Sequence, residues 1–163
     1  MSVYSFFSAH FPVLFPLVFT AGALLAGRAS LSEHHRRVIL SGISFALVFT
    51  AMLFVLVYMR LPQQGEAVWL ALNGVNLVMV FLVSLMAVIL IKFSQRYLYS
   101  ETRVHQFWRW LLLSLASVSV VILSNHLLLL WLGWVSISMC FHRLLLFYPD
   151  RPRAVLAAHK KFI

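Results

Sequence analysis

The stretch NHLLLLWLGWVSISMCFHRLLLFYPDRPRAVLAAHKKFI, residues 125–163, decides the fold class of this chain. It opens with a polar turn, continues as an apolar run that ends at Arg143, and closes with a basic segment, residues 149–163. An apolar run of about 20 residues bounded by charge is typical of a helix that crosses a bilayer. The stretch therefore predicts a transmembrane helix followed by a basic segment on the cytoplasmic side.

The composition indicates an integral membrane protein along the whole chain. Of its 163 residues, 63% are hydrophobic and 10% are charged, and the mean hydropathy is +0.94. Ordinary soluble domains carry about 25% charged residues. A net charge of +9 on so apolar a chain favours anchoring at the cytoplasmic surface over nucleic-acid binding. The single cysteine, Cys140, excludes a disulfide within the chain and a cysteine-based metal site.

The sequence predicts an all-α, polytopic membrane helix bundle of five transmembrane helices in a single membrane domain, residues 1–163. The uncharged runs at residues 6–27, 38–59 and 68–91 are each long enough to cross roughly 30 Å of hydrocarbon at about 1.5 Å per residue. Residues 1–9 carry no Lys or Arg, so the first run is expected to remain as a span rather than to act as a cleaved signal.

The last two spans are predicted from one longer run. Residues 110–142 contain no Lys, Arg, Asp or Glu, and as a single helix they would measure about 50 Å, which is too long for one span. The polar cluster SNH at residues 124–126 predicts a tight turn between spans at residues 107–124 and 126–147. His126 is interpreted as a turn residue rather than as a proton carrier.

Residues near the ends of the spans predict local features of the structure. Pro12 and Pro16 predict a kinked or frayed start to the first span. Residues 28–37 are expected to form a charged loop in which the paired histidines are solvated rather than metal ligands, because no further ligands are near in sequence. Trp108 and Trp110 are expected to anchor the fourth span at the membrane surface.

Small or polar residues within the spans are interpreted first as helix contacts. Asn73 and Asn76 open the third span, where bonds to neighbouring helices are favoured over a polar path. Gly133, Ser136 and Cys140 recur at helical spacings in the fifth span. Such a stripe of small side chains lets another helix approach closely, so it predicts a helix-packing face.

A second face of the fifth span carries the one candidate for proton chemistry. Val135, Ser138 and His142 are spaced i, i+3, i+7, and His142 is the only histidine in the apolar part of this helix. A histidine there can relay protons near neutral pH. It can equally mark the cytoplasmic interface together with Arg143, and the sequence favours this second interpretation.

The Lys and Arg residues fall almost entirely on one side of the predicted spans. Three follow the first span, four follow the third, and five lie from Arg143 onward, so that only Arg60 falls on the other side. Because cytoplasmic loops are rich in Lys and Arg, this distribution predicts an N-terminus outside and a C-terminus in the cytoplasm.

The sequence contains no pattern of a catalytic or cofactor-binding site. It lacks a nucleophile and base pair, paired carboxylates, a Gly-rich phosphate loop and zinc-ligand spacing. The predicted spans contain no acidic residue. The chain is therefore expected to be a membrane component rather than an enzyme, and to hold no metal or cofactor of its own.

Two blocks of sequence resemble the antiporter-like subunits of respiratory complex I and of multisubunit cation/proton antiporters. The first block is SNHLLLLWLGW at residues 124–134, followed by Cys140 and by AAHKKFI at residues 157–163. The second is NGVNLVMVFLVSLMAVILIKFSQRYLYSE at residues 73–101. Within that superfamily, GWVSISMCFHRLLLFYPDRP at residues 133–152 is most similar to DabB, the membrane subunit family of energy-coupled inorganic carbon transporters.

The resemblance implies a function in the bacterial cell inner membrane. DabB-type subunits pair with a DabA-like cytoplasmic zinc subunit that resembles a β-type carbonic anhydrase. Flow of protons or sodium through the membrane subunit is expected to drive CO2 hydration, or bicarbonate accumulation, in that partner. The resemblance thus places zinc in the partner, and it implies a further membrane chain if this chain supplies only part of the antiporter fold.

Two departures from the family pattern bear on mechanism. Complex I-type members carry a glutamate after the GW pair, where this chain has Val135, and a neutral aliphatic side chain cannot hold a proton. The resemblance also covers only about the first third of a typical member. If an ion path touches this chain, His142 is the first candidate, with Ser138 and Lys160 weaker ones.

Two alternatives remain open. The chain could be part of a complex I-type or cation/proton antiporter arm, against which Val135 argues. It could instead be a non-transporting membrane scaffold that docks a cytoplasmic protein or anionic lipid through Arg151, Arg153, Lys160 and Lys161.

Overall fold

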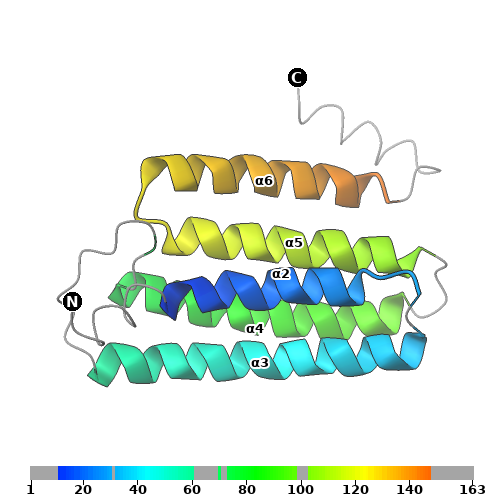
Figure 1. Ribbon diagram of the computed structural model, residues 1–163, viewed down its shortest axis with the longest axis horizontal. Coiled ribbons are helices and arrows are strands. Elements are labelled where there is room, and N and C mark those ends of the chain that lie inside the picture. The colour runs from blue at the N-terminus through cyan, green and yellow to red at the C-terminus, as the bar shows by residue number, and fades with distance from the viewer. Residues whose placement is uncertain (1–10, 31, 61–69, 71–72, 99–102, 148–163) are drawn as a thin grey trace.

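The computed structural model describes residues 11–30, 32–60, 70, 73–98 and 103–147, and the regular elements in these ranges are helices (Figure 1). The elements are η1 Phe11–Val13, a 3-10 helix, followed by α2 Leu14–Ala26, α3 Glu33–Arg60, α4 Gly74–Tyr97, α5 Val104–Leu123 and α6 Leu127–Leu145. The prediction of an all-α helix bundle is confirmed. Four of these helices, α3 to α6, are long and apolar enough to cross a membrane, whereas α2 has 13 residues.

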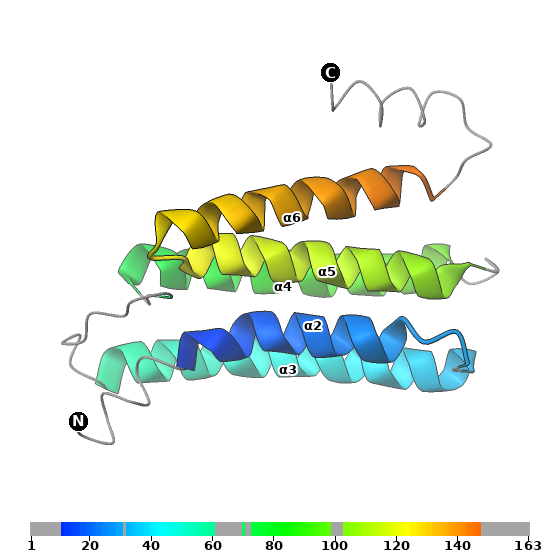
Figure 2. The ribbon, with the colours of Figure 1, turned by 45° about the horizontal axis from the view of Figure 1, so that its top comes forward.

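The helices lie side by side in three layers. Figure 2 shows α2 and α3 in one layer, α4 and α5 in the next, and α6 on the outside. Helix α5 is the centre of the bundle, because it packs against α2, α4 and α6, while α2 lies between α3 and α5. Helix α6 packs chiefly on α5. Successive helices run in opposite directions (Figure 1). Among α3 to α6, α6 has the smallest buried share of its residues.

The prolines determine how the first helix begins. Pro12 lies in the 3-10 turn η1, and Pro16 is the third residue of α2. A proline in the first turn is tolerated because the backbone N–H groups there have no partner within the helix. The irregular start predicted for the first span is thus a change from 3-10 to α geometry, and residues 6–10 of that predicted span lie outside the described residues.

Small residues let α2 approach both of its neighbours, and the sequence analysis did not identify them. A Cβ on Gly22 would lie 2.7 Å from Ile43 Cδ1 of α3 and 3.5 Å from Leu112 Cδ1 of α5. Ala23 and Ala26, on the same helix, are fully buried. The spacing of these residues is the small-residue signal that could have predicted this contact.

Helix α3 begins earlier than predicted, which corrects the charged loop at residues 28–37. The backbone N–H of His35 donates to Ser32 Oγ at 3.5 Å, and Ser32 thereby caps the helix. Glu33 lies in the first turn, where a carboxylate interacts favourably with the helix dipole. The segment from Glu33 onward is therefore helical rather than a loop.

Helix α4 is displaced along the sequence relative to the predicted span at residues 68–91. Leu70 forms an isolated bridge with Ser124, and Asn73 is the extended residue before the helix. The helix then continues through Lys92 to Tyr97, because basic residues near a helix C-terminus complement its dipole. Asn73 is thus the residue before α4 and Asn76 lies in its first turn, so both lie at the opening of this candidate span, as predicted.

The core of the bundle is aromatic and aliphatic. Phe15 of α2 contacts Phe19 at a centroid distance of 5.4 Å and Phe54 of α3 at 5.9 Å. Trp108, at the start of α5, is only 2% exposed and is the largest fully buried side chain among the described residues. The prediction that Trp108 anchors the chain at the membrane surface is therefore wrong; Trp110 is half-buried.

Buried serines line the helix contacts and bond within their own helices. Ser84 donates to the Val80 carbonyl at 2.7 Å, and Ser119 donates to the Ala116 carbonyl at 2.7 Å. Ser44 donates to the Leu40 carbonyl in the same way. Such bonds satisfy the hydroxyl groups without a partner from another helix, so the serines act as small packing residues.

Candidate functional site

The turn between α5 and α6 is held by residues of the predicted polar cluster. Ser124 ends α5 and donates through Oγ to the Val121 carbonyl at 2.8 Å. His126 precedes α6, and its ring Nδ1 accepts from the Leu128 backbone N–H at 3.3 Å. An N-cap acceptor satisfies one of the free N–H groups of the first turn. His126 therefore has a structural role at this turn.

Helix α6 meets α5 through two of the three residues in the predicted packing stripe. A Cβ on Gly133 would lie 2.6 Å from Val121 Cγ2 and 3.6 Å from the Ser117 carbonyl oxygen, both of α5. Gly133 and Cys140 are both buried, and at seven residues apart they lie on one side of α6. Ser136 is instead exposed and donates to the Leu132 carbonyl of its own helix at 2.9 Å. Ser136 follows Gly133 by three residues. At 100° per residue this places Ser136 about 60° around the helix from Gly133, away from the line of contact with α5.

Two of the predicted ion-path residues, Ser138 and His142, lie on the opposite side of α6 and are half-buried. Val135, at the position of the family glutamate, lies on the same side and is 40% exposed. At 3.6 residues per turn, these three positions face away from the line of Gly133 and Cys140. The structure thus does not bring the predicted path residues into the α5 contact.

The remaining predicted site residues cannot be placed. Lys160, the third path candidate, lies outside the described residues. The same is true of the predicted partner or lipid contacts, Arg151, Arg153 and Lys161.

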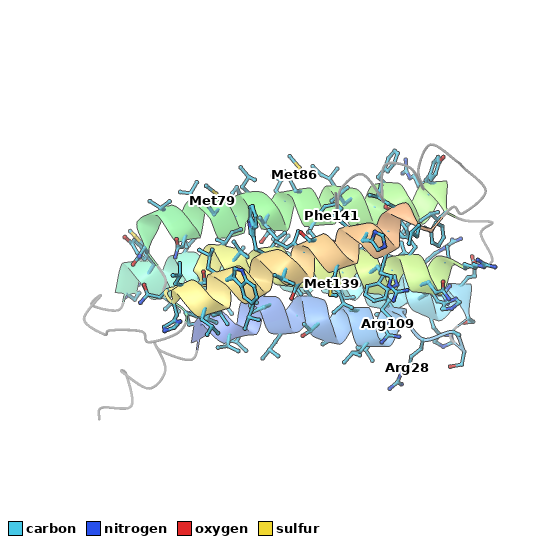
Figure 3. The ribbon with its side chains drawn as sticks, turned by 90° about the horizontal axis from the view of Figure 1, so that it is seen from above. Arg28, Met79, Met86, Arg109, Met139 and Phe141 are labelled. Atoms are coloured by element: carbon cyan, nitrogen blue, oxygen red, sulfur yellow. The ribbon has the colours of Figure 1, made fainter. Side chains whose placement is uncertain are left out.

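Basic residues gather at one end of the bundle. In the described ranges, eight of the nine Lys and Arg residues lie where α2, α4 and α6 end and α3 and α5 begin, and Arg60 lies at the other end. Figure 3 shows Arg28 and Arg109 at this basic end. The Arg143 guanidinium lies over the Trp110 ring, 5.7 Å from its centroid, and joins α6 to α5 there. The side of the membrane that this end faces stays a prediction.

The outer faces of α4 and α6 are apolar. Met79 and Met86 of α4 and Met139 and Phe141 of α6 all lie at the surface in Figure 3. Such surfaces are typical of contact with lipid or with further membrane helices. Among the described residues, no group of three His, Cys, Asp or Glu side chains is arranged to hold a metal ion.

No protein-family model matches the chain. It is 36% identical over 152 residues, 93% of its length, to a protein from Hydrogenovibrio crunogenus named as a probable inorganic carbon transporter subunit, DabB. It is also 36% identical over 60% of its length to a probable subunit DabB2 from Halothiobacillus neapolitanus. NADH-quinone oxidoreductase subunit L of Escherichia coli is 31% identical over 58% of the chain.

The chain spans only part of these relatives. The matched region covers 29% of the DabB relative, 18% of the DabB2 relative and 15% of subunit L. The resemblance to DabB membrane subunits, and more distantly to antiporter-like complex I subunits, is confirmed.

Proposed function

We propose that this chain, as a homologue of DabB subunits, is part of the membrane subunit of an energy-coupled inorganic carbon transporter. The observation that carries the proposal is the similarity to the DabB relative over 93% of the chain. The similarity to subunit L extends over only 58%. The bundle of long apolar helices supports a multi-pass protein, which we place in the bacterial inner membrane.

In this proposal the chain contributes translocation or anchoring, and the hydration of CO2 occurs in a DabA-like zinc subunit. Protons or sodium are the proposed coupling ions. The relatives continue well beyond the matched region, so the rest of a membrane subunit would complete the path. We place the contribution of this chain along the side of α6 that carries Ser138 and His142, because Gly133 and Cys140 form the contact with α5 on the other side.

The proposal is tested by purifying the native complex through a tag on this chain in mild detergent. Mass spectrometry identifies the partners, and elemental analysis measures zinc. We expect a large cytoplasmic subunit that carries zinc, and uptake of labelled inorganic carbon by cells that express both proteins. Recovery of the chain without a zinc-bearing partner would argue against the proposal.

A complex I-type arm is the second candidate, and the similarity to subunit L favours it. Recovery of quinone-oxidoreductase or antiporter subunits in the same purification would support this candidate instead. A non-transporting scaffold is the third candidate. Ion flux in vesicles reconstituted with the purified complex separates it from the others, because a scaffold gives none.

A further inference from the structure

A small pocket opens at the basic end of the bundle, between the start of α3, the end of α4 and the start of α5. It encloses about 30 Å³. Its floor is formed by Leu40, Leu98 and Trp108, which are all nearly fully buried. The pocket lies apart from the α5–α6 contact and from the candidate path residues on α6.

The walls of the pocket supply positive charge and N–H donors. Arg36 is only 8% exposed, and its Nη2 donates to the Arg28 carbonyl at 3.5 Å. Gln95 Nε2 is buried and has no hydrogen-bond acceptor among the described residues. Buried N–H donors are normally hydrogen-bonded, so we expect an acceptor oxygen to bind at this site. A guanidinium beside an amide N–H binds a phosphate or carboxylate oxygen well.

The pocket is small and partly open. The space available to the centres of water-sized groups is about 30 Å³, and about 10–15 Å³ of such space holds one water molecule. The pocket therefore has room for a few oxygen atoms, such as those of one phosphate group, and the rest of a larger ligand would extend from its open side.

The surroundings of the pocket match an anionic phospholipid. Further basic side chains, among them Arg37 at the rim and Lys92 and Arg96 on α4, lie at the same end of the bundle. Phe93 and Tyr97 of α4 are 65% and 67% exposed, and their rings stack at 6.0 Å. Charged head-group contacts beside an exposed apolar helix surface are the arrangement that holds a lipid at a membrane interface.

We propose that the pocket between α3, α4 and α5 binds the phosphate group of an anionic phospholipid through Arg36 and Gln95. The acyl chains then lie along the exposed apolar surface of α4. Glu33 also lines the pocket, and it is exposed at the rim. Its carboxylate repels the phosphate, so Glu33 weakens the site rather than forming part of it.

The test is native mass spectrometry of the delipidated complex that contains this chain, titrated with phosphatidylglycerol, with phosphatidylcholine and with inorganic phosphate. We expect one tightly retained phosphatidylglycerol for each copy of the chain, and weaker retention of phosphatidylcholine. Arg36→Gln should weaken that binding about tenfold, because a charge-assisted hydrogen bond is lost. Gln95→Leu should weaken it less, and Glu33→Gln should strengthen it.

Arg109→Gln is the matched control, because Arg109 is exposed at the same end but does not line the pocket. Should Arg36→Gln fail to fold, the opposite changes expected for Gln95→Leu and Glu33→Gln still test the site. Equal losses for Arg109→Gln and Gln95→Leu would overturn the proposal in favour of diffuse charge attraction. Equal retention of phosphatidylcholine, or displacement of the lipid by inorganic phosphate, would overturn the lipid assignment. Each readout is independent of partner identity and of transport.

Discussion

At the scale of single residues, the packing of this bundle depends on side chains that are absent or small. Gly133 allows Val121 of α5 to lie where a Cβ would otherwise be, and Gly22 does the same for Ile43 of α3. In a bilayer the lipid is as apolar as the helix surfaces, so close van der Waals contact replaces the hydrophobic effect as the source of association. A single added side chain at such a position therefore separates two helices.

Gly133→Leu should destabilise the α5–α6 contact by about 2 kcal/mol, because the new side chain overlaps Val121 and α6 must shift. Thermal unfolding of the purified protein in detergent measures the change. Gly42→Leu is the control, since a Cβ at Gly42 would meet no atom within 4 Å beyond the adjacent backbone of its own helix, and it should leave the midpoint unchanged or raise it. Equal effects of the two substitutions would contradict the packing role of Gly133.

His142→Ala should lower uptake of inorganic carbon about tenfold or more if His142 carries protons in the proposed path. Uptake in cells that express the native complex is the measurement. His126→Ala is the control, because this histidine accepts the Leu128 N–H at the turn. It should reduce stability by about 1 kcal/mol and leave uptake per folded complex unchanged. Unchanged uptake by the His142 variant would remove this residue from the path.

At the scale of whole helices, α3 shows why one apolar surface is buried and another is not. Leu40, Leu47 and Phe54 recur every seven residues and are almost fully buried, whereas Phe45 and Met52 recur at the same interval and are exposed. The two faces have the same chemistry. Only the positions of α2 and α4 against α3 distinguish them.

Phe54→Ala should destabilise the protein by about 3–5 kcal/mol, because its ring fills the space beside Phe15 and a cavity would remain. Phe45→Ala on the same helix is the matched control. Phe45 is 75% exposed, so its truncation should change stability by less than about 1 kcal/mol. Chemical denaturation in detergent compares the two, and a similar loss from both would contradict the assignment of the α3 faces.

At the scale of the whole molecule, charge and connectivity define two unlike ends. Antiparallel helices bring residues from the start of α3, the end of α4 and the start of α5 to one end, where eight of the nine described basic residues lie. The opposite end holds the α5–α6 turn and Arg60. Because positive residues are retained on the cytoplasmic side, the basic end is predicted to face the cytoplasm.

Cysteine labelling with a membrane-impermeant maleimide tests this orientation in intact cells. In a Cys140→Ala background, Asn125→Cys at the α5–α6 turn should react from outside. Arg28→Cys at the basic end should react only after the membrane is permeabilised. Both positions are exposed, so access to the reagent depends on the side of the membrane. The reverse labelling pattern would invert the predicted topology.

The amino-acid sequence alone predicted the membrane class, the long apolar helices, the turn at residues 124–126 and the clustering of basic residues. These follow from local composition, because length, polar breaks and charge are properties of contiguous residues. It also predicted Gly133 and Cys140 as contact residues, since small side chains at helical spacing are a local signal. Helix ends were predicted less well, because hydropathy does not report the capping of α3 by Ser32 or the bridge between Leu70 and Ser124 that precedes α4.

Which apolar faces are buried became clear only from the three-dimensional structure. In the structure, Trp108 lies in the core rather than at the membrane surface, and Ser136 is exposed rather than packed on α5. Arg36 and Gln95 line the same pocket. The physical reason is that apolar residues occupy every side of these helices, so their hydrophobic pattern does not distinguish lipid from protein. The inward face is selected by the fit of one helix against another, and that fit depends on residues distant in the chain.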